Sequence, residues 1–326
     1  MRLFRSPVQR TFASIGLASL TSLLALISLA AHADALPSAP IDPQHPGSKI
    51  YSYGVTEKDF TCSGREVNVF LPTGGGTRAF PVVVYGHGQA LGVENYRATL
   101  EHLAKKGVIA IFPTYDSGFF DQDWTRMGRD YSNLAGCAIG QLGAQVSTGN
   151  IVFSGHSKGA YVASIAAGLA EKESLPTRAR SVVLFEAAGS DAATLSSYDS
   201  ATALTVVFSD ADTTVQRDFS ETIYAQAASH RKQFIYFKSY PSLKADHMWP
   251  LTKGTLFGGG PESAFHYYGE WKWLVAAAQD LTSGASVSNP YIYGALAGDK
   301  GVSGLADDVR RSFQLDRFSD FDTESP

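Results

Sequence analysis

A short segment around Ser157 has the residue types needed for nucleophilic catalysis. Residues 155–159 are Gly-His-Ser-Lys-Gly, a G-x-S-x-G pattern. The β-branched and aromatic run at 151–153 predicts a strand before the pattern, and the alanine-rich run at 160–167 predicts a helix after it. This context predicts a nucleophile elbow, in which the two glycines let strand and helix pass close to the serine. The helix N-terminus would favour a developing oxyanion.

A serine hydroxyl is a weak nucleophile, so it needs a base, and the base needs an acid that orients it. Asp212 and His247 each follow an expected strand. The carboxyl ends of parallel strands meet at one edge of a sheet, so both residues should lie near the elbow. The order Ser157, Asp212, His247 predicts a catalytic triad of nucleophile, acid and base.

The identity of the acid is open between three carboxylates. Asp212 is favoured, but Asp210 lies two residues earlier in the same loop, and Glu186 ends the expected strand at 181–185. Asp246 is adjacent to His247, and it is not expected to orient the ring because neighbouring side chains diverge.

An acyl-transfer site also needs two N–H groups that stabilise an oxyanion. The residue after the nucleophile, Lys158, is one expected donor. The other is Gln89, which follows His87 and Gly88 in the loop after the expected strand at 80–85. The remaining histidines, including His156, are expected to pack in the fold, and none has metal-ligand spacing. We therefore expect no metal and no cofactor.

Alternating strands and helices are expected to hold these residues in place. This alternation is typical of βαβ units and predicts an α/β fold with a mostly parallel central sheet and helices on both faces. Expected strands lie at 67–71, 80–85, 108–112, 151–153, 181–185, 203–208 and 233–240, and expected helices at 95–106, 131–146, 160–172, 214–230 and 262–281.

The first 33 residues resemble a secretory signal peptide. Arginines at positions 2, 5 and 10 precede an uncharged apolar stretch at 12–31, and Ala31-His32-Ala33 fits a cleavage site. An uncleaved anchor is the alternative. Cleavage after Ala33 predicts a secreted or periplasmic protein without a stable membrane anchor. We then expect an extended leader at 34–49, rich in proline, and a catalytic domain at 50–326 with a C-terminal extension from about 282.

Composition limits the classes of partner. The 326-residue chain is 44% hydrophobic and 18% charged with a net charge of −4, which is typical of a globular protein and gives no basic footprint for nucleic acid. We expect a monomer. Export would place Cys62 and Cys137 where disulfides persist, so a bridge is predicted, with two separate buried thiols as the alternative.

These motifs resemble the α/β-hydrolase superfamily, specifically secreted dienelactone-hydrolase-like proteins and bacterial cutinase-like polyester hydrolases. The resemblance extends from Phe80 to about Leu281 and implies the α/β-hydrolase fold. Cutinase-like enzymes usually have methionine where this chain has Lys158, and an aromatic residue where it has Gln89.

Spacing predicts an open site. Only 55 residues separate Ser157 from Asp212, and the connection at 186–202 is too short for a helical lid domain. Four aromatic side chains could form apolar walls or could pack in the core: Phe119, Phe120, Trp124 and Trp249.

Taken together, the residues predict a secreted serine hydrolase that cleaves small, lipidic or polymeric carboxylic esters through an acyl-enzyme. A peptidase or an acyltransferase could use the same triad. The alternative from another class is an exported binding protein that uses a hydrolase scaffold without catalysis.

Overall fold

A mostly parallel sheet forms the centre of the fold. The strand order is β1-β2-β4-β3-β5-β6-β7-β8-β9, and the run from β4 to β8 is parallel. The outer strands β1, β2 and β9 pair antiparallel to their neighbours. The strands are β1 (Gly54–Cys62), β2 (Arg65–Thr73), β3 (Phe80–Gly86), β4 (Ile109–Pro113), β5 (Val146–His156), β6 (Ser181–Phe185), β7 (Ala203–Ser209), β8 (Lys232–Phe237) and β9 (Ala306–Arg311).

The computed structural model describes residues 38–116, 118, 120–189, 198–240, 242–283 and 306–311. They belong to a unit that begins at Leu36. The expected signal peptide at 1–33, most of the expected C-terminal extension and Phe119 lie outside the described residues.

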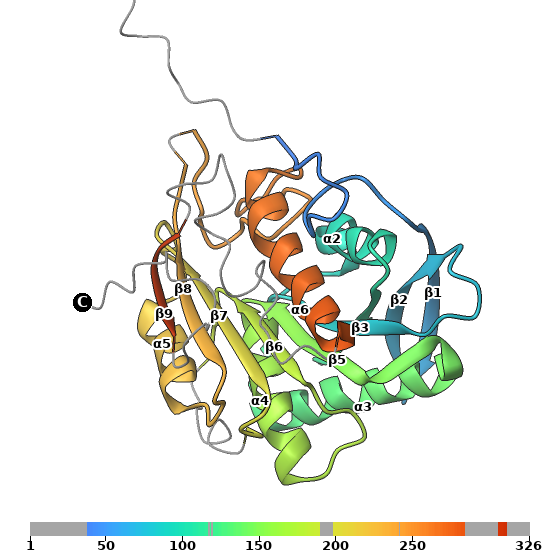
Figure 1. The fold of residues 1–326 in the computed structure, drawn as a ribbon. Coiled ribbons are helices and arrows are strands. Elements are labelled where there is room, and N and C mark those ends of the chain that lie inside the picture. The colour runs from blue at the N-terminus through green and yellow to red at the C-terminus, as the bar shows by residue number, and fades with distance from the viewer. Residues whose placement is uncertain are drawn as a thin grey trace, which may run out of the picture. The chain divides into compact units, whose positions relative to one another are not determined.

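Helices cover both faces of the sheet, as the sequence predicts (Figure 1). Helices α2 and α6 pack on one face, and α3, α4 and α5 pack on the other. Successive side chains of β3 point to opposite faces of the sheet and pack against both helical layers. Val82 and Val84 face α3 and α4, whereas Val83 and Tyr85 face α2 and α6. The helices are α2 (Val93–Lys105), α3 (Trp124–Leu142), α4 (Lys158–Lys172), α5 (Arg217–Gln226) and α6 (Trp271–Ser283), the last continuing the π-helical turn η3 (His266–Glu270).

The strand order reverses beside β3, which pairs with β4 on one side and β5 on the other. The chain leaves β3 toward β4 and later leaves β5 in the opposite direction, toward β6. In open α/β sheets a crevice forms at such a reversal, outside the carboxyl ends of the strands. The loop after β3 and the turn after β5 are therefore the expected walls of a ligand site.

Several element boundaries differ from the expected ones. Helix α3 begins at Trp124 rather than near 131, because the Asp123 side chain accepts a hydrogen bond from the Arg126 N–H at 3.0 Å and caps the helix there. Strand β1 was not predicted, since its mostly exposed polar residues lack the apolar alternation of a half-buried strand. Strand β9 lies in the expected C-terminal extension, where no strand was predicted.

The proline-rich leader is partly packed against the residues that follow it. Residues 45–48 are buried, and His102 Nε2 lies 2.8 Å from the carbonyl oxygen of Pro46. The Lys106 ammonium, just after the end of α2, donates to the carbonyl oxygens of Pro43 and His45 in the leader and of Ile50 directly after it, at 3.1–3.3 Å. These donors satisfy backbone groups that no strand or helix pairs, so the leader belongs to the folded unit.

The predicted disulfide is present between Cys62 and Cys137, which lie 75 residues apart. It ties the end of β1 to α3. Because β1 is a mostly exposed edge strand, this link adds a covalent restraint where few apolar contacts exist.

Replacing both cysteines with alanine is expected to lower the free energy of unfolding by about 2–4 kcal/mol, because the reduced unfolded chain regains the entropy of a long loop. Urea unfolding of the two proteins measures the difference. A reductant should lower the free energy of unfolding of the wild type by a similar amount and leave that of the double variant unchanged. Equal stability of the two proteins would show that the bridge does not stabilise the fold.

A buried carboxyl lies between α6, α2 and β3. Glu270 is fully buried, and it hydrogen-bonds to the hydroxyl of Tyr85 at 2.5 Å and to that of Thr99 at 2.8 Å. Burial raises the pKa of Glu270 to about 8, although both hydrogen bonds oppose the shift. The side chain therefore folds in its neutral form near neutral pH.

The free energy of unfolding should consequently fall between about pH 4.5 and pH 8, where the unfolded chain loses this proton and the folded chain keeps it. Glu270→Gln removes the ionisation, so this variant should gain stability relative to the wild type as the pH rises. Urea unfolding at pH 5 and pH 8 tests this, with Glu171→Gln as an exposed control. An identical pH dependence in wild type and Glu270→Gln would contradict the expectation.

Candidate active site

Ser157 occupies a strained turn between β5 and α4. Its backbone has φ +57° and ψ −124°, a left-handed conformation that non-glycine residues rarely adopt. A Cβ at Gly159 would overlap the carbonyl group of Gly86, and one at Gly155 would lie 2.5 Å from the carbonyl carbon of Gly159. The glycines of the pattern therefore allow the close approach of strand and helix that the sequence predicts.

The structure brings Ser157, His247 and Asp212 together. His247 Nδ1 lies 2.7 Å from Asp212 Oδ2, and His247 Nε2 lies 2.8 Å from Ser157 Oγ. An ionised carboxylate can only accept, so Nδ1 carries the proton and Nε2 is left to accept from the serine hydroxyl. This is the tautomer that a general base beside a serine requires.

The loop after β7 holds Asp212 in its ionised form. Its other oxygen accepts hydrogen bonds from the backbone N–H groups of Thr214 and Val215 at 2.8 and 3.1 Å. Burial alone would raise the pKa of Asp212, but the hydrogen bond and charge of His247 and these two N–H groups outweigh it and lower that pKa.

The two alternative acids have other partners. Asp210 accepts hydrogen bonds from the backbone N–H and the hydroxyl of Ser239, at 2.9 and 2.6 Å. Glu186 accepts from the Ser209 N–H at 3.1 Å and from the Trp249 indole N–H at 2.8 Å, and it also bonds to the Ser209 hydroxyl. The geometry therefore places Asp212, and neither alternative, against His247.

Glu186 nevertheless interacts electrostatically with Asp212. It is fully buried at the end of β6, and burial, followed by the charge of Asp212, raises the pKa of Glu186 well above its ordinary value. The hydrogen bonds from Ser209 and Trp249 oppose this shift without cancelling it. The pKa values of these two neighbouring carboxyls thus shift in opposite directions, so negative charge is favoured on Asp212 and disfavoured on Glu186.

The expected oxyanion donors belong to the start of α4 and to the loop after β3. Lys158 is the first residue of α4, so its N–H has no acceptor within the helix. In the loop after β3, the Gly88 N–H donates to the Tyr96 hydroxyl at 3.0 Å, so Gly88 itself is not a donor for an oxyanion. Gln89 follows directly in this loop, and its backbone N–H remains the predicted second donor.

The side chain of Lys158 forms a buried ion pair. Its ammonium lies 3.0 Å from Asp116 Oδ2, and the two side chains are only 4% and 12% exposed. Asp116 follows Tyr115, whose ring stacks on His87 at 4.4 Å and whose hydroxyl donates to the His87 carbonyl. The pair therefore connects the elbow to the segment that supports the loop after β3.

The predicted aromatic walls are not brought together. Trp249 is buried among Phe185, Phe237 and Phe265, with its N–H on Glu186, so it packs in the core instead of forming an open wall. Trp124 is half-buried with its ring edge on Tyr161, whereas Phe120 is 88% exposed. Phe119 and part of the 186–202 connection, on which the absence of a lid was predicted, lie outside the described residues.

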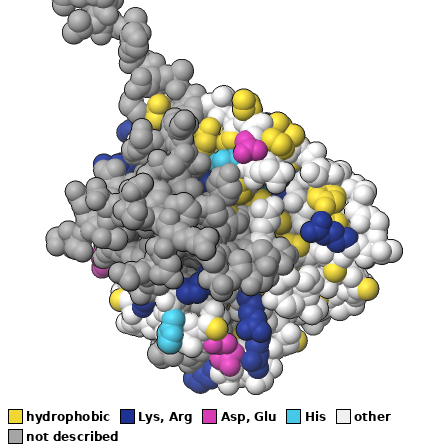
Figure 2. All heavy atoms as spheres, viewed as in Figure 1, with side chains coloured by type: hydrophobic (Ala, Val, Ile, Leu, Met, Phe, Trp, Pro, Cys, Tyr) yellow, Lys and Arg dark blue, Asp and Glu magenta, His cyan; other side chains and the backbone are white. Residues whose placement is uncertain are grey.

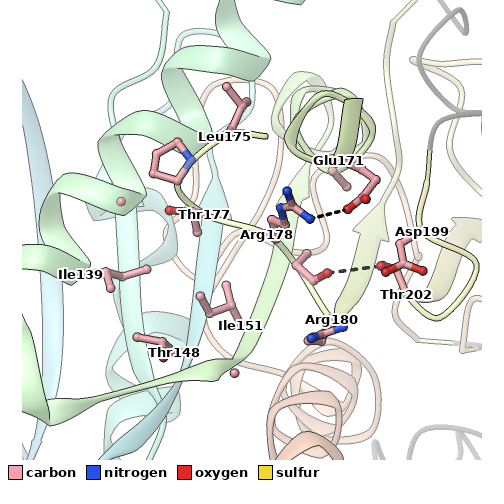
Figure 3. Close-up of a pocket in the computed structure, with 15 residues that line it drawn as sticks. Ile139, Thr148, Ile151, Glu171, Leu175, Thr177, Arg178, Arg180, Asp199 and Thr202 are labelled. Atoms are coloured by element: carbon pink, nitrogen blue, oxygen red, sulfur yellow. Dashed lines mark hydrogen bonds and ion pairs between the residues drawn. The ribbon is translucent and has the colours of Figure 1, made fainter. Parts of the chain in front are cut away.

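A cavity of about 460 Å³ lies away from these groups (Figure 3). It is lined by residues that precede β6 and β7, among them Arg178, Arg180 and Thr202, and Arg178 pairs with Glu171 across it at 3.0 Å. Because these positions are at the amino ends of the parallel strands, the cavity is at the opposite end of the sheet from Ser157. It has no part in the candidate active site.

Two buried residues beside the triad were not anticipated. Tyr96 lies on α2 and hydrogen-bonds to His156 at 2.8 Å, and Asp116 pairs with Lys158. Neither contact has a local sequence signal, because the partners are 60 and 42 residues apart. The lysine after the nucleophile is a sequence signal that could have indicated a buried carboxylate partner, but it was not interpreted in that way.

Within the described residues, no group of three or more His, Cys, Asp or Glu side chains is arranged to hold a metal ion. None of the described helices is long and apolar enough to cross a membrane. Figure 2 shows charged side chains of both signs spread over the described part of one face. No family model matches the sequence, and comparison with curated proteins gives no significant match.

Isosteric substitution can identify the carboxyl that orients the His247 ring in the proposed catalytic array. Asp212→Asn should lower kcat by about 10⁴-fold, because an amide cannot hold the imidazole in the required tautomer. Glu186→Gln should lower it by about tenfold or less, since glutamine is also neutral and only one of the donors around it loses an acceptor. Steady-state kinetics on one substrate compare the variants. The opposite ranking would assign the acid to Glu186.

Proposed function

We propose that this protein is a serine hydrolase of the α/β-hydrolase superfamily that cleaves carboxylic esters through an acyl-enzyme. The observation that carries this proposal is the buried array in which Asp212, His247 and Ser157 are joined by hydrogen bonds of 2.7 and 2.8 Å. The strained backbone of Ser157, at the carboxyl end of β5 and the start of α4, supports it. So does the chain order of nucleophile, acid and base in a mostly parallel sheet.

In the proposed acylation step, Ser157 Oγ attacks the ester carbonyl carbon while its proton passes to His247 Nε2. Asp212 stabilises the imidazolium that forms and keeps Nδ1 as the donor to itself. The carbonyl oxygen becomes an oxyanion, for which the backbone N–H groups of Gln89 and Lys158 are the proposed donors. When the C–O bond breaks, His247 returns the proton to the leaving alcohol and the acyl group stays on Ser157.

Deacylation uses the same groups with water as the nucleophile. His247 takes a proton from the water that attacks the acyl carbonyl, and the second oxyanion forms in the same position. Return of the proton to Ser157 Oγ then releases the carboxylic acid and restores the free site.

We further propose that the protein is exported. The bridge between Cys62 and Cys137 supports this proposal, because disulfides form and persist in oxidising compartments. The resemblance to secreted cutinase-like and dienelactone-hydrolase-like enzymes is consistent with the same location.

Purified protein should release p-nitrophenol from p-nitrophenyl acyl esters, and Ser157→Ala should lower kcat by about 10⁴- to 10⁶-fold. The preferred acyl length, from acetyl to palmitoyl, would separate an esterase from an enzyme acting on lipidic or polymeric esters. Ser164→Ala is a matched control, because Ser164 is a buried serine of α4 whose hydroxyl donates to the Tyr161 carbonyl of the same helix at 2.7 Å.

Failure to hydrolyse any of these esters would overturn the esterase assignment. Hydrolysis that persists in Ser157→Ala would show that another group performs the chemistry. Turnover of amides or transfer of the acyl group to added alcohols would redirect the assignment to a peptidase or an acyltransferase.

A further inference from the structure

Three consecutive hydrogen bonds join the loop after β3 to the loop that carries His247. The Gly88 N–H donates to the Tyr96 hydroxyl oxygen at 3.0 Å. Tyr96 Oη lies 2.8 Å from His156 Nδ1, and His156 Nε2 lies 2.7 Å from the carbonyl oxygen of His247. The two ends of this chain are the loop of the proposed oxyanion donor and the backbone of the proposed base.

The direction of every bond in this chain is fixed by its ends. The carbonyl oxygen of His247 can only accept, so His156 Nε2 carries the proton. His156 Nδ1 is then an acceptor and must receive the Tyr96 hydroxyl proton, which leaves the Tyr96 oxygen free to accept from Gly88. Each polar group is satisfied in one arrangement only, so the chain holds a single geometry.

His156 keeps this arrangement over the pH range in which a serine hydrolase works. Burial, with a smaller contribution from His247, lowers the pKa of His156 to about 3. Because both nitrogens of a protonated imidazole are donors, protonation would break the bond from Tyr96. The neutral form therefore preserves the contact with His247 while His247 itself gains and loses a proton.

We infer that Tyr96 and His156 are positioning residues, which set the place of the His247 imidazole between Ser157 and Asp212. This inference rests on the proposed function. His247 lies in a loop outside the regular strands and helices, so its backbone has no sheet ladder to fix it. The hydrogen bond from His156 Nε2 restrains the His247 backbone. The ring of His247 must stay within hydrogen-bond distance of both Ser157 and Asp212. A displacement of about 1 Å at such a residue can cost about 10²-fold in rate.

The hydroxyl of Tyr96 makes the hydrogen bonds of this chain, whereas its ring packs in the core, so the two can be tested separately. The Tyr96 ring is fully buried and lies against Tyr85 and Phe112 at 5.2 and 5.8 Å. Tyr96→Phe retains these ring contacts and removes only the hydroxyl. Tyr198→Phe is the matched control, because this buried hydroxyl donates to the Ser164 carbonyl at 2.9 Å and has no contact with the triad.

The test is the rate at which Ser157 is phosphonylated by a fluorophosphonate probe, since this covalent step needs the activated serine and no particular ester. Tyr96→Phe should react about 10- to 100-fold more slowly than wild type, and Tyr198→Phe at the wild-type rate, although both lose a buried hydrogen bond. With an ester substrate the same change should appear in kcat, with KM nearly unchanged. Thermal unfolding of each variant shows that the fold is retained.

A second pair of variants tests His156 directly. His156→Gln can present an amide N–H near the position of Nε2, whereas His156→Leu cannot, so glutamine should retain more labelling than leucine. If Tyr96→Phe does not fold, this comparison decides the question.

The outcomes separate the two proposals. Wild-type labelling that depends on Ser157, together with an unchanged rate in Tyr96→Phe, would overturn the positioning role and leave the hydrolase proposal intact. Equal labelling of His156→Gln and His156→Leu would overturn it in the same way. Absence of Ser157-dependent labelling and of ester hydrolysis in the wild type would overturn the proposed function itself, and the positioning role with it.

Discussion

The close approach of α4 to the ends of β3 and β5 is the constraint on which the candidate site depends. No side chain fits at Gly159, because it would overlap the carbonyl of Gly86, and the space at Gly155 is equally restricted. This contact forces Ser157 into a left-handed backbone at the top of the sheet and presents the start of α4 beside it. The reversal of strand order at β3 brings the loop after β3, which carries Gln89, and the turn after β5, which precedes Lys158, to the same edge of the sheet. The strained backbone of Ser157 is held in place by the packing of α4 against β3 and β5.

The electrostatics around the array follow from two neighbouring carboxyls, Asp212 and Glu186, whose pKa values shift in opposite directions. Asp212 receives two backbone N–H groups and the imidazole of His247, whereas Glu186 lies fully buried at the end of the neighbouring strand. The Asp212 charge is one reason why the pKa of Glu186 is raised. Glu186 in turn holds the indole N–H of Trp249, two residues beyond His247. The side chain that might have replaced the acid therefore supports the loop that carries the base.

Local and periodic signals in the sequence predicted the parts of the fold that depend on short-range rules. The strand, G-x-S-x-G pattern and helix around Ser157 form a single local unit, and Asp212 and His247 follow strands whose hydrophobic runs are clear. The α/β class and the mostly parallel sheet followed from the alternation of elements. What could not be predicted depends on pairings across the chain: Tyr96 with His156, Asp116 with Lys158, and Glu186 with Trp249. Trp249 illustrates this, because the sequence around an aromatic residue that follows His247 looks the same whether the residue packs in the core or lines an open site.

His247, the proposed base, is held by contacts from elements distant in sequence, and this follows from its position. His247 contacts both the elbow and the loop after β7. It lies on neither of them but in the connection between β8 and η3, which has no regular hydrogen-bond ladder at this residue. In that connection the Ala245 N–H donates to Ser239 at 3.0 Å, the His247 carbonyl accepts from His156, and Trp249 donates to Glu186. Together these three contacts hold the loop on both sides of the imidazole. Reactivity of Ser157 would then depend on buried polar groups that never touch a substrate, and these groups should tolerate substitution far less well than their distance from the chemistry suggests.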